Sequence, residues 1–138
     1  VEMAGGAPVW KEAAQGGGWV VVNLEQIAAW NPDQIYVINY FGDVDETAEQ
    51  LRADPQWQQL QAVQAERLYA FPKDFYSWDQ PDTRWILGLQ WIARTLHPDL
   101  FDTTSMDTRI REFYRQVYRM DDTAYEAIIE PILTGDLN

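Results

Sequence analysis

The sequence predicts an α/β fold: a layered helix/sheet/helix lobe with a mostly parallel central sheet, followed by a helical C-terminal third. Two patterns lead to this class. Up to residue 71, short β-branched or apolar runs alternate with segments of helical period, which is typical of parallel strands joined by helical crossovers. From residue 82 onward only helical patterns follow. With 138 residues, the chain is long enough for a single domain over 1–138 and too short for two ordinary ones.

Residues 1–18 are rich in Gly and Ala, so a loop is expected there, with a short helix over Val9–Ala14. Gly16–Gly18 is not expected to bind phosphate, because phosphate-binding loops follow a strand and open a helix. These glycines instead precede Trp19–Val22, a β-branched run that we predict to be a strand.

A capped helix and a buried strand are predicted next. Asn23 can cap the helix, and Gln26 lies three residues later, as in a capping box. Glu25 points away from the apolar face of this helix into solvent. Pro32 disfavours helical geometry at the residue before it and therefore ends the helix. The run Ile35–Ile38 is nearly all apolar, as expected for a parallel strand that is covered on both faces.

The middle of the chain repeats the order of helix and strand. Asp43 and Glu46 form a second capping signature, for a helix that ends before Pro55. A helical turn is expected near Trp57. Arg67–Phe71 is predicted to be the third strand.

The last third of the chain is predicted to hold three helices. The first spans Asp82–Leu96 and is apolar around much of its circumference. Thr104 and Asp107 are expected to cap the second, and the third begins near Asp122. The predicted inner side of the first helix comprises Trp85, Ile86, Leu89, Ile92 and Leu96, with Leu87 and Trp91 off it.

Composition excludes several classes of protein. The 22 acidic and 10 basic residues give a formal charge of −12, which repels nucleic acid and anionic membranes but suits a basic protein partner. The chain has no cysteine, which excludes disulfides and thiolate zinc sites. No run approaches the roughly 20 apolar residues of a membrane helix. The first residues also lack the pattern of a signal peptide, although an exported protein loses that segment on maturation.

Side chains that commonly carry catalysis are few, so no enzymatic activity, metal site or cofactor is predicted. His97 is the only histidine and lies at a helix C-terminus, where a cation interacts favourably with the helix dipole; haem or metal ligation is the alternative. Asp43 and Asp45 are expected to serve the start of their helix. A small hydrolase that uses Glu25 or Asp43 is a further alternative, but it requires a second polar group in a pocket, and the sequence points to none.

Aromatic side chains gather where ligand-contacting loops are expected. Tyr40 and Phe41 follow the second predicted strand, and ligands bind at the carboxyl ends of strands in open α/β sheets. The tract Phe75–Pro81 follows the next strand and contains Tyr76 and Trp78. Two interpretations of Trp78 stay open: it lines a site, or it covers the packing of a helix.

Several short motifs, each weak alone, occur in a specific order along nearly the whole chain. They are Gly5-Gly6, Asn23-Leu24-Glu25-Gln26, Asn31-Pro32-Asp33, Asp54-Pro55-Gln56-Trp57, Leu60-Gln61-Ala62-Val63, Arg67-Leu68-Tyr69, Ser77-Trp78 to Pro81, the helix of Arg84, and Leu96-His97-Pro98. In this order they resemble the C-terminal lobe of the substrate-binding proteins of ABC importers for iron-siderophores, haem, cobalamin and oxyanions. Members of that family have two α/β lobes joined by a long helix, with the ligand in the cleft between them. The resemblance implies that the N-terminal lobe and the linker helix are absent from this chain.

The resemblance also implies a function and a site. The chain would be one lobe of a receptor that delivers an iron complex, a corrinoid, haem or a metal oxyanion to the membrane permease of an ABC importer. Glu25 would dock on an arginine pocket of the permease subunits, and Arg84 at the start of its helix would serve an oxyanion. The cleft candidates are Tyr40, Phe41, Tyr76, Trp78 and Arg84, with Trp10 and Trp19 as further candidates.

The same resemblance implies an exported protein, either periplasmic or lipid-anchored at the outer face of the cytoplasmic membrane. The lone lobe is expected to fold, to bind ligand poorly because half of the contacts are missing, and to self-associate through its uncovered face. The competing hypothesis is an acidic protein-interaction domain without a ligand. It differs from the receptor hypothesis only if the cleft aromatics prove to be buried core.

Overall fold

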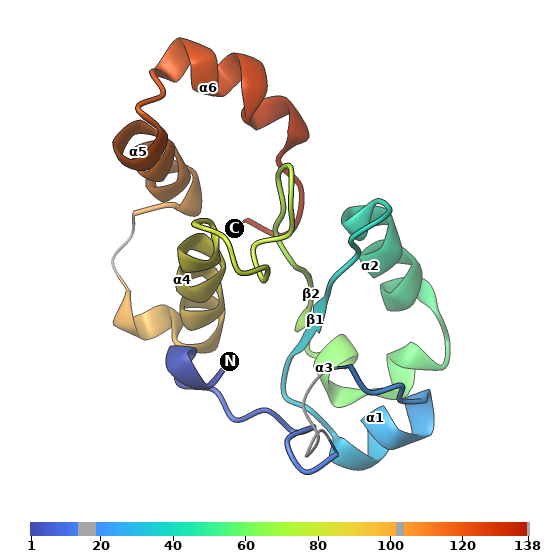
Figure 1. The fold of residues 1–138 in the computed structure, drawn as a ribbon. Coiled ribbons are helices and arrows are strands. Elements are labelled where there is room, and N and C mark those ends of the chain that lie inside the picture. Colours follow the sequence, from blue (N-terminus) through green and yellow to red (C-terminus); the bar gives the residue numbers. More distant parts are fainter. Residues whose placement is uncertain (14–18, 102–103, 138) are drawn as a thin grey trace.

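The computed structural model describes residues 1–13, 19–101 and 104–137, and Figure 1 shows how they are arranged. In chain order the elements are η1 (Glu2–Ala4), α1 (Leu24–Trp30), β1 (Ile35–Val37), α2 (Val44–Ala53), η2 (Trp57–Gln59), α3 (Gln61–Gln64), β2 (Leu68–Ala70), α4 (Trp85–Leu96), η3 (Pro98–Leu100), α5 (Met106–Tyr118), α6 (Asp122–Ile128) and η4 (Glu130–Ile132). In these ranges, no helix has both the length and the apolar character needed to cross a membrane.

Two parallel strands, β1 and β2, form the sheet at the centre of the fold. Their register places Ile35 opposite Leu68 and Val37 opposite Ala70. Helices α2 and α3 lie on one side of the sheet and α4 lies on the other (Figure 1). This arrangement confirms the predicted α/β layers. Each strand has only 3 residues, so both are shorter than predicted.

The predicted strand at Trp19–Val22 is wrong. These residues have no regular secondary structure, and the Trp19 and Val21 side chains are 84% and 99% exposed. A β-branched run forms a strand only where a neighbouring strand pairs with it, and no described residue does so here. The segment therefore crosses the surface and leads into α1, where Asn23 caps the helix by accepting a hydrogen bond from Gln26 N at 2.9 Å.

Most helices begin at local capping signals. The Asp43 carboxylate accepts hydrogen bonds from the amides two and three residues later and begins α2 as predicted. Ser105, and not the predicted Thr104, caps α5, because its hydroxyl is the group that accepts a hydrogen bond from Thr108 N. The predicted helix at Val9–Ala14 is a set of turns over residues 9–13, and residue 14 lies outside the described ranges.

The sheet separates two apolar clusters, and together they form the core. This separation explains why both faces of β1 and β2 are apolar in the sequence. The cluster beside α4 and α5 contains Phe71, Trp78, Leu87, Trp91, Met106, Ile110, Tyr114, Tyr125 and Ile129. The cluster beneath α2 contains Val44, Ala48, Leu68 and Ala70.

Helix α4 turns a different face to the core than predicted. Leu87, Gly88 and Trp91 are buried, whereas Trp85 is 43% exposed. Because this helix is apolar on most sides, its sequence pattern does not identify the inner face. Gly88 allows the close approach: a Cβ atom there would lie 2.6 Å from the Trp78 carbonyl oxygen. The face that carries Trp85 is therefore left at the surface.

The last described residues close the outer edge of β2. The backbone of Thr134 exchanges two hydrogen bonds with that of Lys73, at 3.0 and 3.1 Å, and Asp136 N donates to Ala70 O at 2.9 Å. The Asp136 carboxylate in turn accepts hydrogen bonds from Ala70 N at 2.7 Å and from the Arg52 guanidinium. This segment acts as a short third strand on an edge whose backbone groups would otherwise be unpaired.

Candidate ligand-binding surface

Two loops meet at the carboxyl end of the sheet. We call them the β1 loop, residues 38–43, and the β2 loop, residues 71–84. Because the two strands are parallel and in register, both loops begin at the same end of the sheet, where the strands have their carboxyl ends. The Tyr40 hydroxyl donates a hydrogen bond to the Asp79 carboxylate, which joins one loop to the other. The two aromatic segments singled out in the sequence are therefore in contact.

The β1 loop is shaped by one side chain, that of Asn39. Its Oδ1 accepts hydrogen bonds from Phe41 N at 3.1 Å and Gly42 N at 2.8 Å, and its Nδ2 donates to Thr47 Oγ1 at 3.0 Å. An amide side chain that bonds to its own following backbone makes a tight turn. The turn leaves the Phe41 ring fully exposed, at 101%.

Tyr40 connects this turn to two further aromatic rings. Its ring makes edge contacts with Trp19, at a centroid distance of 5.9 Å, and with Phe41, at 6.4 Å. Desolvation, together with the hydrogen bond to the Asp79 carboxylate and its negative charge, raises the pKa of Tyr40 to about 12. The phenol thus stays protonated at neutral pH and acts as a donor to Asp79.

A surface hollow of about 570 Å³ borders the β2 loop, between the N-terminal segment and α4. Its walls are largely apolar and include two exposed indole rings, those of Trp10 and Trp85. Asp79, which holds the Tyr40 hydroxyl, also lines it. Sequence reasoning missed Trp85 as a surface residue, because its spacing matched the predicted inner side of α4. The lining residues are Val1, Glu2, Met3, Pro8, Trp10, Lys11, Phe71, Trp78, Asp79, Trp85, Gly88, Leu89 and Ile92.

Trp78 belongs to the core. It is 1% exposed, and its Nε1 donates a hydrogen bond to Asp74 Oδ2 at 3.0 Å. Of the two interpretations of Trp78, the structure favours packing, since its ring has almost no surface left for a ligand. Two other aromatic residues of the same loop reach solvent: Phe75, which is 58% exposed, and Tyr76, which is 55% exposed.

Arg84 carries its charge next to two carboxylates. Its Nε and NH2 bond to the Asp82 carboxylate at 3.1 and 2.7 Å, and its NH1 bonds to Asp74 at 3.0 Å. Desolvation acts to lower the pKa of Arg84, but the hydrogen bond to Asp82 and the charges of both acids raise it above its ordinary value. Its side chain is only 12% exposed, and the guanidinium lies over the Tyr76 ring, 5.0 Å from the centroid. The charge is balanced within the fold, which leaves little of it for an anion.

Asp74 is the buried centre of this network. Its carboxylate accepts hydrogen bonds from the Tyr114 hydroxyl on α5, from Trp78 and from Arg84. Burial, together with the neighbouring carboxylate, raises the pKa of the Tyr114 phenol, so it remains a donor. The sequence carries no signal for this centre, because Tyr114 lies 40 residues away along the chain. The network fastens the β2 loop to the helical C-terminal third.

Glu25 lies in the first turn of α1 and is exposed. Helix α1 has no fully buried residue, so it rests on the outside of the lobe and presents Glu25 to solvent. Among the residues that the structure describes, no group of three His, Cys, Asp or Glu side chains is arranged to hold a metal ion.

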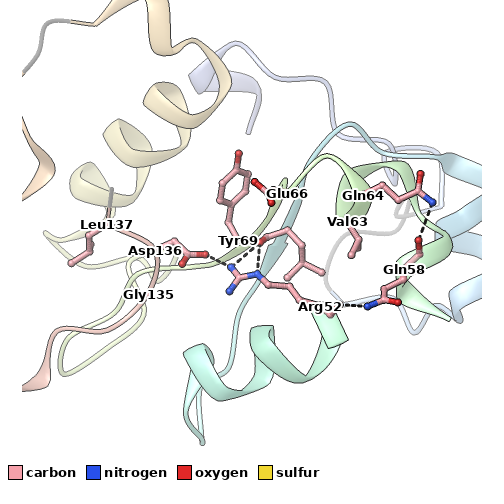
Figure 2. A pocket seen from close by; sticks show the side chains of 10 residues that line it. Arg52, Gln58, Val63, Gln64, Glu66, Tyr69, Gly135, Asp136 and Leu137 are labelled. Carbon is pink, nitrogen blue, oxygen red and sulfur yellow. Dashed lines mark hydrogen bonds and ion pairs between the residues drawn. The ribbon is translucent and has the colours of Figure 1, made fainter. Parts of the chain in front are cut away.

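A larger hollow, of about 970 Å³, lies beside β2 and away from both loops. Figure 2 shows that its centre is occupied by the Arg52 guanidinium, which bonds to Leu68 O at 2.8 and 3.1 Å and to Asp136. A relay of amides continues from it: Gln58 Nε2 donates to Arg52 O, and Gln64 Nε2 donates to Gln58 O (Figure 2). These polar groups are mostly paired with one another, so few of them are available to a ligand.

Comparison with known proteins relates this geometry to a family. The family model described as periplasmic binding protein matches residues 1–75. The molybdate-binding protein MolA of Haemophilus influenzae is 30% identical over 103 residues, which make up 74% of this chain and 28% of MolA. The chain thus spans less than a third of that relative.

Solved structures agree with this relationship. A periplasmic solute-binding protein from Veillonella parvula superimposes with a TM-score of 0.69 and 26% identity, over 94% of this chain and 40% of that one. The molybdate-bound structure of MolA has a TM-score of 0.59 and 26% identity, over 75% of this chain and 31% of MolA. These relatives are binding proteins and not enzymes, in line with the expectation from the sequence. The match over residues 1–75, more than half of the chain, shows that this protein belongs to the periplasmic binding protein family.

Proposed function

We propose that this chain is one lobe of the solute-binding protein of an ABC importer, and that its β1 and β2 loops form its half of the ligand site. One observation carries the proposal: exposed aromatic rings gather at the carboxyl ends of two parallel strands, where α/β sheets bind ligands. A second lobe would cover this surface and supply the other half. Such a receptor acts outside the cytoplasm, either free in the periplasm or held by a lipid anchor.

The first ligand class to test is a metal oxyanion, because the relative MolA is named for molybdate. In this lobe Arg84 is an unsuitable partner for it, since Asp74 and Asp82 already balance its charge. Most of the positive charge that binds an oxyanion would therefore come from the other lobe. The exposed hydroxyl of Tyr76 on the β2 loop is one donor that this lobe can offer.

The second class is a ring-bearing metal complex, such as a ferric siderophore, a corrinoid or haem. The aromatic content of this surface favours it: Phe41 and Tyr76 are exposed on the two loops, and Trp10 and Trp85 line the hollow that borders the β2 loop. Flat aromatic faces contact ligand rings through large apolar areas at low entropic cost. The Asp79 carboxylate at the edge of the hollow repels a small anion and does not hinder a neutral or cationic ligand.

Tryptophan fluorescence distinguishes these classes, since Trp10 and Trp85 line the hollow. The protein that carries this lobe together with its second lobe would be titrated with molybdate, tungstate, haem, cobalamin and a ferric siderophore. We expect saturable quenching by one class, weakened in Phe41→Ala and Trp85→Ala. Val117→Ala, an exposed apolar position on α5, is the matched control and should bind as the parent does. If no ligand quenches, the receptor proposal fails.

We propose further that Glu25 docks on the basic surface of the permease. The support is its exposure in the first turn of a peripheral helix, on a protein with a net charge of −12. Glu25→Arg in the complete receptor should lower transport and leave ligand affinity unchanged. Glu49→Arg, the same charge change on the exposed face of α2, should leave transport near the parent value. Loss of ligand affinity in Glu25→Arg would place this residue in the cleft and contradict docking.

A further inference from the structure

We propose that Lys73 is a positioning residue for the β1 loop: its ammonium binds two backbone carbonyls of the loop and thereby orients Tyr40 and Phe41. The consequence for ligand binding rests on the function proposed above. The positioning itself does not, and it can be tested in this chain alone.

Lys73 is placed where three segments of the chain converge. Its backbone pairs with Thr134 of the C-terminal segment and forms an antiparallel bridge to Ser77 within the β2 loop. Its side chain crosses to the β1 loop, where Nζ donates to Asn39 O at 3.2 Å and to Gly42 O at 3.1 Å. The ammonium thus joins the two loops a second time, in addition to the Tyr40–Asp79 hydrogen bond.

The two carbonyls that Lys73 binds are the first and last of the turn that carries Tyr40 and Phe41. Asn39 satisfies the amides of this turn, at Phe41 and Gly42, but a side-chain oxygen cannot donate to the carbonyls. The Lys73 ammonium donates hydrogen bonds to these two carbonyls. With amides and carbonyls both held, the turn is fixed at its two ends, and the rings between them have a defined direction.

The two cationic side chains of the β2 loop therefore stabilise different loops. Arg84 is held by two carboxylates and braces its own loop. Lys73 is held by two neutral carbonyls and braces the neighbouring loop. A hydrogen bond from an ammonium is stronger than one between neutral groups, so the loss of this contact should loosen the β1 loop more than the loss of an ordinary surface contact.

The test compares three variants of this chain. Lys73→Met keeps the length and apolar stem but removes the donors, whereas Lys73→Arg keeps a charged donor. Arg67→Met, an exposed position at the amino end of β2, is the control for loss of one positive charge. If Lys73→Met does not fold, Lys73→Gln takes its place. The first measurement is hydrogen exchange of the backbone amides of residues 40–43, with α5 amides as the internal reference.

In Lys73→Met we expect exchange over residues 40–43 to be roughly tenfold faster while α5 is unchanged, with parent-like exchange restored in Lys73→Arg. The near-ultraviolet circular dichroism of the Trp19–Tyr40–Phe41 cluster should weaken in the same variant. Equal exchange in Lys73→Met and the parent would overturn the proposal. So would equal acceleration in α5, because Lys73 would then serve only global stability.

Ligand affinity is measured separately, in the two-lobed protein, with molybdate and with haem as probes. We expect Lys73→Met to weaken the probe that binds by several-fold and Lys73→Arg to restore it. If neither probe binds the parent, the ligand is neither molybdate nor haem, and the exchange result still decides the role of Lys73. If the loop loosens but affinity is unchanged, the β1 loop does not contact the ligand.

Discussion

The β1 loop and the β2 loop both begin at the carboxyl end of the sheet but are stabilised in different ways. The β1 loop is short, lies at the surface and is held by the amide of Asn39 and by the Lys73 ammonium. The β2 loop is longer and is fastened by the buried carboxylate of Asp74 to Arg84 and to Tyr114 on α5. The first loop places a fully exposed ring on the surface, and the second places its largest ring, Trp78, in the core.

Trp78 is buried beside the anchor of its loop, because its Nε1 donates a hydrogen bond to Asp74, whereas Phe41 lies on a turn at the surface. The β1 loop is held by its own turn, by the Lys73 ammonium and by the Tyr40–Asp79 hydrogen bond, and these contacts leave the Phe41 ring exposed. A loop anchored through a buried charge must first satisfy that charge, and Arg84 is used for this purpose. The β1 loop is therefore the better candidate for ligand contact, and the β2 loop is the better candidate for support.

The largest expected effect comes from breaking the anchor of the β2 loop. Asp74→Ala should lower the free energy of unfolding by about 3–5 kcal/mol, because it leaves Arg84 without one partner and the Tyr114 hydroxyl buried and unpaired. Urea unfolding followed by circular dichroism measures it. Tyr114→Phe removes one hydrogen bond only and should cost about 1–2 kcal/mol. Equal effects in the two variants would contradict a charge-centred anchor.

Breaking the turn of the β1 loop should cost less. Asn39→Ala removes three hydrogen bonds, all near the surface, and is expected to lower the free energy of unfolding by about 1–2 kcal/mol. The same unfolding measurement applies, with Asn39→Asp as a control that retains the acceptor oxygen for both amides. A loss as large as that of Asp74→Ala would remove the contrast between the loops.

A smaller effect is expected when the Asp82–Arg84 ion pair of the β2 loop is tested through the acid dependence of stability. Desolvation acts to raise the pKa of Asp82, but the hydrogen bonds and charge of Arg84 outweigh it, so this pKa is lower in the folded than in the unfolded chain. The stabilisation is therefore complete above the unfolded value of about 4, and it is lost as the pH falls through the folded value. Asp82→Asn should unfold with a shallower acid slope between about pH 4 and 2. Asp33→Asn, at an exposed acid in the turn before β1, is the control for the same change of charge.

The smallest effect on stability is expected at the most exposed ring. Phe41→Ala should change the free energy of unfolding by less than about 0.5 kcal/mol, since the side chain buries almost no area in this lobe. Thermal unfolding measures this, and ligand titration of the two-lobed protein should show a weakened affinity for the same variant. A clear loss of stability together with unchanged affinity would make Phe41 a structural residue.

Local signals in the sequence were sufficient for much of the fold. The start of α1 at Asn23, the start of α2 at Asp43 and the positions of β1 and β2 follow from capping and from apolar runs that act within a few residues. The same reasoning failed at Trp19–Val22, where the local preference is met by no neighbouring strand. It also failed on α4, where apolar residues lie on most sides of the helix.

The sequence by itself therefore determined the α/β class, the family resemblance and the aromatic content of the two loops, because these depend on short-range patterns. Only the tertiary structure decided which aromatic rings are buried in the core and which lie at the surface. Asp74 meets Tyr114 across 40 residues, Gly88 brings α4 against Trp78, and Trp85 is left beside Trp10. These choices depend on contacts between segments far apart in the chain, and the energy of such contacts appears only once the whole lobe has packed.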